Sequence, residues 1–385
     1  MTFSEAKHPK KILLLIRSLN MGGSERQVVS FAKTVSSYGV EVHVAVKTSG
    51  GLLEADLLDC RGVILHHVDQ NGMFGRLAYL WRLRKLIKSN RFDAVYGFMP
   101  VPNLTLLIAR TMRNRPVIAW GIRSSELDTN IYGTRVKWAM ELERILARYA
   151  DRIITNSQAA LIEYQKKGYP VSKLIHIPNA IDVQRFQPNP EARHQLEIDI
   201  GIEPDTRVIG LFARIHPMKD HLTFLYAAKS LIRKYPNVRF LCAGEDSEGY
   251  ENYGDQIRHK STSLELENHV IWLGARNDPE KLMAACDITT LTSNNGEGFP
   301  NSVAESLACG TPCIVTDVGD GPKIVNDQHS VVKRGDAEEL SRKWLALLKL
   351  IDNQLGPEED ELRNSILERY LPDLIYQETL SKLVK

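Results

Sequence analysis

Hydrophobic residues along this chain fall into short continuous runs that are separated by amphipathic stretches. The first run, Lys11–Ile16, is followed by a glycine-containing turn, an amphipathic stretch over residues 24–38 and a second apolar run over residues 42–46. Continuous apolar runs of this length are typical of strands buried on both faces, and helical periodicity between them predicts a covering helix. The opening of the chain therefore predicts a β-α-β unit.

The same alternation of strand-like and helical segments runs through the rest of the chain. Further strands are expected at residues 63–68, 94–98, 117–120, 152–155 and 174–177. Two prolines within residues 187–190 interrupt the pattern. A second series of strands is expected at residues 208–212, 238–242, 270–273, 288–291 and 313–316. Alternation of this kind predicts an α/β fold in which helices cover parallel sheets.

Three segments follow from this pattern. Residues 1–186 and 187–368 are predicted to form two Rossmann-like parallel-sheet domains that face one another across a cleft. Residues 369–385 contain a helix after Pro372 that is long enough to return to the N-terminal domain. Ligands of such sheets bind at the carboxyl ends of the strands, so the chemistry is expected in the loops that follow strands.

Composition and charge narrow the classes of protein to which the chain can belong. Its 385 residues exceed what one hydrophobic core usually supports, in agreement with two domains. The 49 basic and 47 acidic residues nearly cancel, so no large field is available to hold a nucleic acid backbone. No nucleic acid partner is therefore expected.

Cysteine usage and the first apolar run bear on location. The five cysteines are scattered and form no C-x-x-C pair, which argues against a disulfide framework or a zinc knuckle and fits a reducing cytoplasm. The apolar run at residues 12–16 is far shorter than a signal-peptide core or the roughly 20 residues of a membrane span. A cytoplasmic protein without an exported or transmembrane segment is expected.

The turn after the first strand contains the adjacent glycines Gly22 and Gly23, and Ser24 and Gln27 behind them have capping-box spacing. Backbone N–H groups at such a helix start, with no Cβ in the way, can approach a phosphate or a sugar hydroxyl. The motif is not the G-x-G-x-x-G fingerprint, which disfavours a Rossmann oxidoreductase. A plain tight turn is the alternative reading.

Two cations, Arg214 and Lys219, follow the strand expected at residues 208–212. Arginine offers a planar fork and lysine a compact point charge, a combination suited to neutralising a diphosphate leaving group without a metal. Two solvated surface side chains are the alternative.

The stretch over residues 293–312 is the most informative part of the chain. A glycine-containing loop follows a strand, Pro300 favours a helix start, and Gly310 ends that helix. Glu297 then lies in the loop and Glu305 on the helix, eight residues later. Two carboxylates near a helix N-terminus, which itself favours an anion, predict one ligand that carries hydroxyls and phosphate together.

The spacing of Glu297 and Glu305 resembles the E-x7-E hallmark of the GT-B glycosyltransferases of family 4. The resemblance extends across most of the chain through further motifs. These are Gly22-Gly23, Ile154-Thr-Asn-Ser157, Ile177-Pro-Asn-Ala-Ile-Asp182, Arg214 with Lys219, Ala243-Gly244-Glu245, Leu273-Gly274-Ala-Arg276 and Cys286-Asp287.

The resemblance implies that the N-terminal domain binds the acceptor and the C-terminal domain binds a nucleotide sugar. It implies that the backbone of Gly22 and Gly23 contacts the donor pyrophosphate. Arg214 and Lys219 would hold the phosphates.

The hallmark stretch would bind the rest of the donor. By resemblance, Glu305 accepts hydrogen bonds from the ribose hydroxyls, Glu297 faces the transferred sugar, and the loop at Arg276 holds the base. The backbone that would contact the sugar and phosphate is that of Gly298, Phe299, Pro300, Asn301 and Ser302.

Members of this family retain the anomeric configuration of the transferred sugar, by a proposed front-face displacement. Arg214 and Lys219 would supply the main catalytic contribution by stabilising charge on the departing diphosphate, and Glu297 would position the sugar. No D-x-D pair occurs in the chain, so no metal or other cofactor is expected. The predicted reaction moves a hexose-type sugar, from a UDP-sugar in preference to other donors, to a glycan or lipid-linked glycan in bacterial cell-surface polysaccharide synthesis.

One position departs from the family pattern. Many members carry a histidine in the loop after the fourth or fifth N-terminal strand, and this chain has no histidine there. Arg123 stands in that loop, where it contacts donor or acceptor or is a surface or structural arginine.

The segment from Phe74 to Asn90 reads as a basic amphipathic helix that contains Trp81. Such a helix is compatible with peripheral docking on anionic lipid at the inner face of the cytoplasmic membrane. An ordinary sheet-covering helix is the alternative, because strands are expected on both sides of it.

Two other functions compete with transfer. A sugar-nucleotide epimerase or hydrolase with the same architecture would bind the same donor. A non-catalytic sugar-nucleotide-binding protein would keep the fold without turnover, although every charged residue of the hallmark is present.

Overall fold

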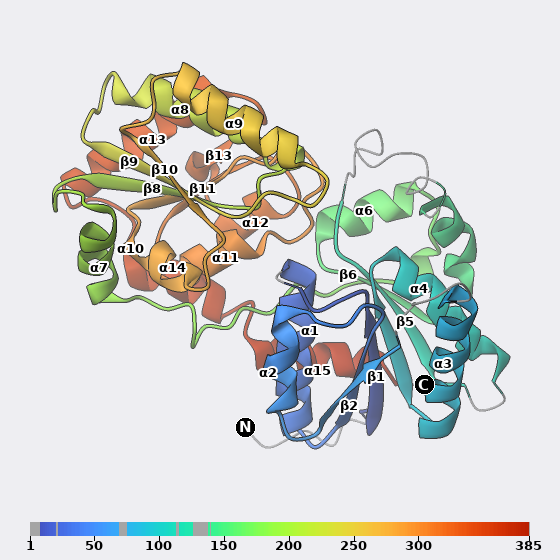
Figure 1. Ribbon diagram of the computed structural model, residues 1–385. Helices are drawn as coiled ribbons and strands as arrows, with labels where there is room; N and C mark the ends of the chain where they lie inside the picture. Colours follow the sequence, from blue (N-terminus) through green and yellow to red (C-terminus); the bar gives the residue numbers. More distant parts are fainter. Residues whose placement is uncertain are drawn as a thin grey trace. The chain divides into compact units, whose positions relative to one another are not determined.

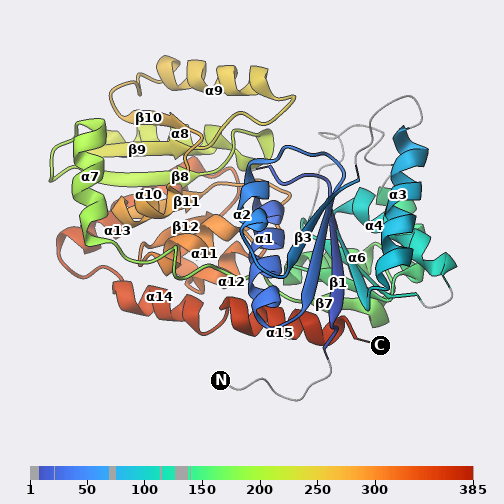
Figure 2. The same ribbon diagram turned by 60° about the horizontal axis from the view of Figure 1, so that its bottom comes forward.

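The computed structural model describes residues 8–20, 22–68, 75–112, 115–125, 138 and 140–384. The chain divides into two compact units. One unit comprises Met1–Ala180 with Pro372–Lys385, and the other comprises Ile181–Leu371. Each unit consists of a parallel sheet flanked by helices (Figures 1 and 2).

The N-terminal unit contains a seven-stranded parallel sheet in the order β3-β2-β1-β4-β5-β6-β7. Its strands are β1 (Lys11–Ile16), β2 (Glu41–Val46), β3 (Val63–His67), β4 (Ala94–Phe98), β5 (Val117–Ile122), β6 (Arg152–Thr155) and β7 (Leu174–His176). Alternate residues of a strand point to opposite faces. In β1, Ile12, Leu14 and Ile16 pack into one hydrophobic cluster, and Leu13 and Leu15 pack into the other.

Helices cover both faces of this sheet. One face is packed against α1 (Gly23–Ser37), α2 (Ala55–Leu58) and α15 (Pro372–Lys382). The other is packed against α3 (Gly75–Asn90), α4 (Pro100–Leu106) and α6 (Gln158–Lys166). Phe74, where the basic helix was expected to begin, lies outside the described residues.

The capping box predicted for Ser24 and Gln27 is wrong. Helix α1 begins at Gly23, and its N-cap, Gly22, provides no side-chain hydrogen bond. The Gln27 amide instead bonds the backbone of Ala180. Spacing alone does not reveal that a distant segment competes for this side chain.

The C-terminal helix α15 packs on α1 of the N-terminal unit (Figure 2). The ring of Tyr376 meets that of Phe31 edge-on, with centroids 5.1 Å apart. Its hydroxyl donates a hydrogen bond of 2.8 Å to Ser30 Oγ.

The C-terminal unit contains a six-stranded parallel sheet in the order β10-β9-β8-β11-β12-β13. Its strands are β8 (Arg207–Phe212), β9 (Val238–Ala243), β10 (Val270–Gly274), β11 (Ile288–Leu291), β12 (Cys313–Thr316) and β13 (Val331–Val332). Its helices are α7 (Pro190–Ile200), α8 (His221–Ile232), α9 (Glu251–Ser263), α10 (Pro279–Ala285), α11 (Asn301–Ala308), α12 (Gly321–Val325), α13 (Ala337–Asp352) and α14 (Glu359–Leu367).

Short 3-10 turns connect several elements in both units. They are η1 (Leu52–Glu54), η2 (Leu107–Thr111), η3 (Ala147–Tyr149), η4 (Val171–Lys173), η5 (Pro217–Lys219) and η6 (Gln328–Ser330).

The core of the C-terminal unit is built around Trp344 of α13. Its ring packs against Phe224 and Phe240, with centroids 5.2 and 5.6 Å away. Its indole nitrogen donates to Thr290 Oγ1 at 2.9 Å, so the one polar atom of this buried side chain is satisfied.

The two units divide between Ala180 and Ile181, six residues before the change of domain that the sequence suggested. The reason is packing, because Ile181, Val183 and Phe186 are buried in a hydrophobic cluster of the C-terminal unit. The return to the N-terminal unit begins at Pro372. Within the described part of the chain, no helix has both the length and the apolar character that crossing a membrane requires.

Candidate functional site

Three loops of the C-terminal unit meet at the carboxyl edge of its sheet. They follow β8, β11 and β12, which are neighbours in the sheet. The backbone N–H of Asn294 donates to Met218 O at 2.9 Å, and Thr292 Oγ1 donates to Lys219 O at 2.8 Å. The N–H of Asp320 donates to Gly298 O at 3.0 Å, which joins the third loop to the second.

Lys219 and Glu297 form an ion pair at the centre of these loops. Lys219 Nζ donates to Glu297 Oε1, and Ser293 Oγ donates to the same oxygen at 2.6 Å. Glu297 is only 6% exposed. Buried charges are tolerated when they are paired and hydrogen-bonded, so these contacts hold a charged group where solvent is scarce.

The turn that carries Lys219 is capped at both ends. His216 Nδ1 accepts from the N–H of Met218 at 3.1 Å, and the N–H of Asp220, whose φ is +46°, donates to Pro217 O at 3.2 Å. Burial of His216, together with nearby Arg214 and Lys219, lowers its pKa to about 4. The ring is therefore neutral at pH 7, as an accepting Nδ1 requires.

Glu305 lies in the second turn of α11 and is 6% exposed. The N-cap of this helix, Pro300, supplies no side-chain acceptor for the first-turn N–H groups. The positive end of the helix dipole thus lies next to the loop that holds Glu297, with Glu305 one turn behind it.

One of the backbone contacts expected from the family pattern needs correction. Pro300 has no N–H group, so it cannot donate a hydrogen bond to a ligand. The ring of Phe299 is buried and packs edge-on against Tyr370, with centroids 5.0 Å apart. Any contact of Phe299 with a ligand must come from its backbone, whereas Asn301 and Ser302 stand at the first turn of α11.

The sequence did not single out Gly319, which lies after β12. Its φ is +60°, and an added Cβ would come within 2.7 Å of the carbonyl oxygens of Glu297 and Gly298. Only glycine therefore permits the backbone to pass beneath the Glu297 loop. A glycine three residues after the end of a buried strand was the available signal.

Arg214 follows the end of β8 and is exposed. Its guanidinium contacts Met218 Sδ at 3.9 Å, and no carboxylate among the described residues forms an ion pair with it. Its backbone is closely packed, because a Cβ on Gly244 would lie 2.0 Å from Ala213 O. The site thus contains one cation that is neutralised, Lys219, and one that is available to an incoming anion.

Arg276 lies apart from this cluster. Its guanidinium makes a bidentate pair with Asp278, at 2.8 and 2.7 Å. Both residues line a groove with Asn189, Gln195 and other residues at α7. Within the described chain, no hydrogen bond or ion pair joins Arg276 to Lys219 or Glu297.

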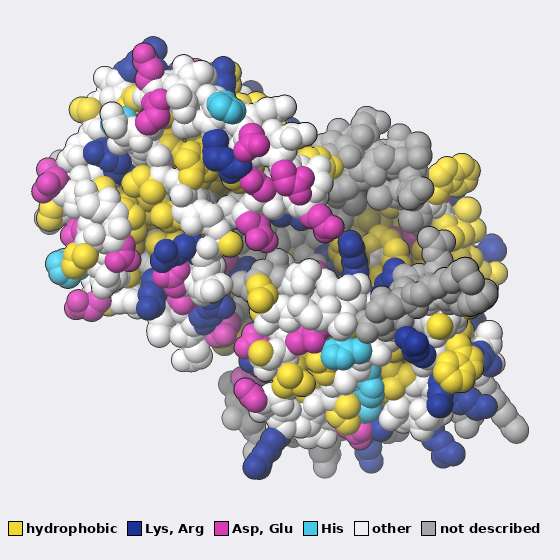
Figure 3. Space-filling model, in the orientation of Figure 1, with side chains coloured by type: hydrophobic (Ala, Val, Ile, Leu, Met, Phe, Trp, Pro, Cys, Tyr) yellow, Lys and Arg dark blue, Asp and Glu magenta, His cyan; other side chains and the backbone are white. Residues whose placement is uncertain are grey.

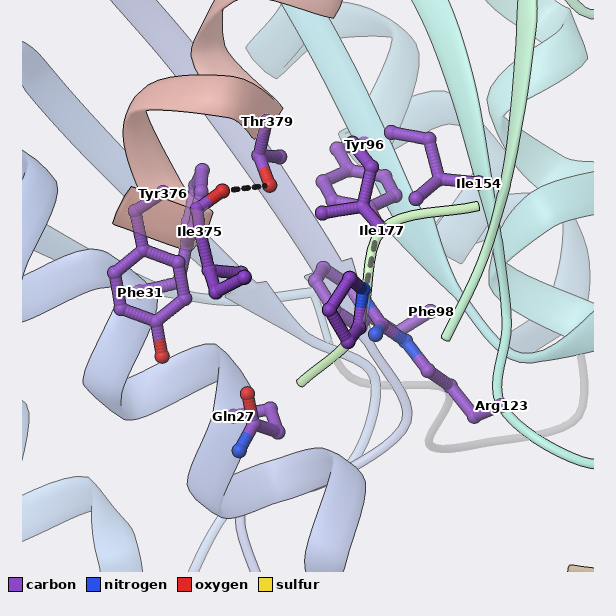
Figure 4. A pocket seen from close by; sticks show the side chains of 11 residues that line it. Gln27, Phe31, Tyr96, Phe98, Arg123, Ile154, Ile177, Ile375, Tyr376 and Thr379 are labelled. Atoms are coloured by element: carbon purple, nitrogen blue, oxygen red, sulfur yellow. Dashed lines mark hydrogen bonds between the residues drawn. The ribbon is translucent and has the colours of Figure 1, made fainter. Parts of the chain in front are cut away.

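The remaining expected residues lie in the N-terminal unit. Gly22 is the extended N-cap of α1, at φ −160°, and Gly23 is the first residue of that helix. Arg123 lines a small pocket, where it donates to Asn179 Oδ1 at 3.0 Å and to the Tyr96 hydroxyl at 2.8 Å (Figure 4). Its guanidinium also lies 4.8 Å from the Phe98 ring centroid, so Arg123 is anchored within its own unit.

Comparison with known proteins assigns the chain to a family. Residues 21–185 match the family model for Glycosyltransferase Family 4, and residues 193–368 match that for Glycosyl transferases group 1. An *Escherichia coli* UDP-Gal:alpha-D-GlcNAc-diphosphoundecaprenol alpha-1,3-galactosyltransferase is 23% identical, over 91% of this chain and 90% of that protein. A phosphatidyl-myo-inositol mannosyltransferase of Mycolicibacterium smegmatis is 23% identical, over 90% and 84% of the two chains.

Solved structures match the whole chain. Anabaena Alr3699/HepE, determined with UDP and glucose, has a TM-score of 0.84 and 23% identity, covering 98% of this chain and 99% of that one. The lipopolysaccharide-biosynthesis glycosyltransferase WaaG has a TM-score of 0.74 and 16% identity, covering 97% and 99%. These likenesses establish the two-domain fold predicted from the sequence. The chain therefore belongs to the GT-B glycosyltransferases of family 4.

Proposed function

We propose that the protein transfers a hexose-type sugar from a nucleotide diphosphate sugar, with UDP as the favoured nucleotide, to a glycan or lipid-linked glycan acceptor. The observation that carries the proposal is the Lys219–Glu297 pair, whose glutamate lies in the loop that leads into the N-terminus of α11 and whose lysine is close in sequence to the exposed Arg214. Carboxylates that can accept hydrogen bonds from sugar hydroxyls and cations that can bind phosphate occur together there, as a nucleotide sugar requires.

The chemistry proposed for the cations is stabilisation of the leaving group. As the bond between sugar and diphosphate breaks, negative charge grows on the diphosphate, and Arg214 with Lys219 offsets it. Glu297, held by Ser293, then faces the sugar, and Glu305 accepts from the ribose hydroxyls. The Anabaena neighbour, whose structure contains UDP and glucose, supports UDP as the nucleotide.

Retention of anomeric configuration and independence from metal are part of the proposal. Two fixed cations can offset the diphosphate charge that a metal ion would otherwise offset, and the chain contains no D-x-D pair. We expect turnover to be undiminished in excess EDTA. Loss of turnover in EDTA that returns on adding Mg²⁺ or Mn²⁺ would refute metal independence.

The proposed acceptor is presented at a membrane surface. On α3, Leu77 and Trp81 are 69% and 63% exposed and lie one turn apart. Lys85 Nζ lies 5.3 Å from the Trp81 ring centroid, and exposed basic residues follow along the helix. In Figure 3, which has the orientation of Figure 1, yellow hydrophobic and blue basic side chains lie together where Figure 1 shows α3. An apolar anchor with cations around it suits an anionic lipid surface.

The name of the *Escherichia coli* relative gives further support to a lipid-linked acceptor, because that protein acts on a diphosphoundecaprenol-linked sugar. The proposed role is in cell-surface polysaccharide synthesis, at the inner face of the cytoplasmic membrane.

The donor is best identified by thermal shift with UDP-, GDP- and ADP-sugars. A ligand at about 100 times its dissociation constant adds about 2.7 kcal/mol of stability. The stabilising donor should lose this effect in Arg214→Ala and in Glu305→Ala. Nucleotide binding that survives both substitutions would place the donor elsewhere, and binding without any transfer to acceptors would favour a non-catalytic binding protein.

A further inference from the structure

The segment through which the chain leaves the N-terminal unit is held by a distant side chain. Gln27 Nε2 donates to Ala180 O at 2.7 Å, and Gln27 Oε1 accepts from Ala180 N at 3.2 Å. Both residues are buried, and they lie 153 positions apart in the sequence. One amide side chain therefore satisfies both polar groups of a single backbone residue.

Ala180 is the last residue of its unit before the chain crosses to the other unit. Asn179, directly before it, accepts from Arg123 at 3.0 Å. Directly after it, Ile181 belongs to the C-terminal unit, where its N–H donates to Tyr370 O at 2.9 Å. The backbone is thus fixed on both sides of the crossing, and Gln27 and Arg123 fix the N-terminal side.

Gln27 also stands close to the glycine turn. It is the fifth residue of α1, which begins at Gly23. An α-helix rises about 1.5 Å per residue and is stiff over one turn. The turn at Gly22 and Gly23 and the segment at Ala180 are therefore joined through a single short, rigid piece of helix.

We propose that Gln27 is a positioning residue, which fixes the Gly22-Gly23 turn and the interdomain crossing at Ala180 as one piece. This inference rests on the proposed function and on the contact between the glycine turn and the donor diphosphate that the family resemblance implies. Arg123 then acts in the same assembly, by holding Asn179, rather than as a substitute for the histidine of other family members.

The test uses Gln27→Met, which keeps the length and most of the volume of the side chain but removes both hydrogen bonds. Amide hydrogen exchange should become faster at Ala180 in the full-length protein, because its N–H has lost its acceptor. We expect kcat/KM for sugar transfer to fall about tenfold, since a displaced donor contact acts on the reaction.

The matched control is Asp151→Ala at the opposite, amino end of β6. Asp151 accepts from Ile118 N at 2.9 Å and pairs with Arg115. Its replacement therefore also removes partly buried hydrogen bonds of the N-terminal unit. The control should lower Tm comparably but leave kcat/KM within about twofold, as its site is remote from the carboxyl edge.

The proposal would be overturned if amide exchange at Ala180 were unchanged in Gln27→Met. It would also be overturned if Gln27→Met lost as much Tm as the control but kept the wild-type kcat/KM. If Gln27→Met does not fold, Gln27→Glu keeps the acceptor for Ala180 N and loses the donor to Ala180 O. Wild-type kcat/KM in that variant would overturn the proposal equally. If the wild type transfers no sugar, the proposed function fails, and the exchange measurement still decides whether Gln27 holds Ala180.

Discussion

At the scale of single residues, Lys219 and Glu297 neutralise one another in a site with little solvent. Replacing either residue alone therefore lowers the stability of the fold. This loss obscures any direct effect of the substitution on activity. Removing one partner leaves a charge that is desolvated and unpaired.

Paired variants separate the effect of Lys219 on stability from its effect on activity. Lys219→Ala should lower kcat about 100-fold and stability by roughly 2 kcal/mol, since a phosphate-binding cation is lost and Glu297 is left unpaired. Lys219→Ala combined with Glu297→Gln should regain most of the lost Tm and none of the lost kcat. Recovery of activity in the double variant would show that Lys219 serves the fold alone.

His216 makes the turn before Lys219 sensitive to acid. Its pKa is about 4 in the folded protein and about 6.5 when exposed, so the unfolded state binds the proton more readily. Its contribution to stability is complete above pH 6.5 and is lost as pH falls toward 4, by at most about 1.4 kcal/mol per pH unit.

The check is His216→Asn, because asparagine is a good cap that does not titrate. Between pH 7 and 5, Tm of the wild type should fall more steeply than Tm of His216→Asn. Parallel Tm profiles for the two proteins would show that this histidine is not the acid-sensitive group.

Single residues were predictable where their spacing carried information. Glu297 and Glu305 stand out because a loop and a helix separate them by a fixed interval, and Lys219 because it follows a strand end. Ser293 did not stand out, because its hydrogen bond to Glu297 depends on the folded shape of the loop. Gln27 was misread, because its partner, Ala180, lies far away in the sequence.

At the scale of elements, the position of the loop that holds Glu297 depends on the backbone at Gly319, which packs against it. Gly319→Ala should lower Tm by several degrees and kcat/KM about tenfold or more, because the new Cβ meets the carbonyl oxygens under Glu297.

Gly335→Ala is the matched control. Gly335 has φ +76°, comparable to Gly319, but its added Cβ would meet nothing within 4 Å. It should therefore show only the cost of a left-handed alanine, about 1 kcal/mol, with kcat/KM unchanged. Equal effects of the two substitutions would mean that backbone strain alone, and not displacement of the Glu297 loop, governs activity.

The exposed face of α3 is tested by vesicle sedimentation. Trp81→Ser and Lys85→Glu should each weaken binding to anionic vesicles at least fivefold, since Trp81→Ser removes the apolar anchor and each near-surface cation contributes about 1 kcal/mol. Binding to neutral vesicles should be weak throughout. Ile198→Ser on α7 is the control, because Ile198 is also exposed but lies on the other unit. Undiminished binding in both α3 variants would leave α3 as an ordinary sheet-covering helix.

Elements were predictable to within a residue or two wherever a strand is buried on both faces, as β1 and β11 are. Strand β13 was missed, because its two residues are too few to show a pattern. The division between units was placed too late, because the prolines at residues 188 and 190 do not mark the boundary: Pro190 begins α7 and Pro188 precedes its N-cap, both within the C-terminal unit.

At the scale of the whole molecule, each unit has its own sheet and core, and the chain passes between them at Ala180 and again at Pro372. Two series of strands and helices in the sequence predict this organisation directly. The sequence also identifies the reaction class through the family pattern. It leaves the acceptor open, because acceptor contacts follow from loop shapes that have no regular spacing.

The most direct test of the account is to follow the sugar itself. Purified protein, the donor that gives the largest thermal shift and an extract of lipid-linked glycans are combined, and the products are examined by proton NMR. We expect a new glycosidic linkage with the anomeric configuration of the donor, formed by the wild type and about 100-fold more slowly by Arg214→Ala. Release of free sugar or of an epimer, with no glycosylated product from any acceptor, would contradict this expectation.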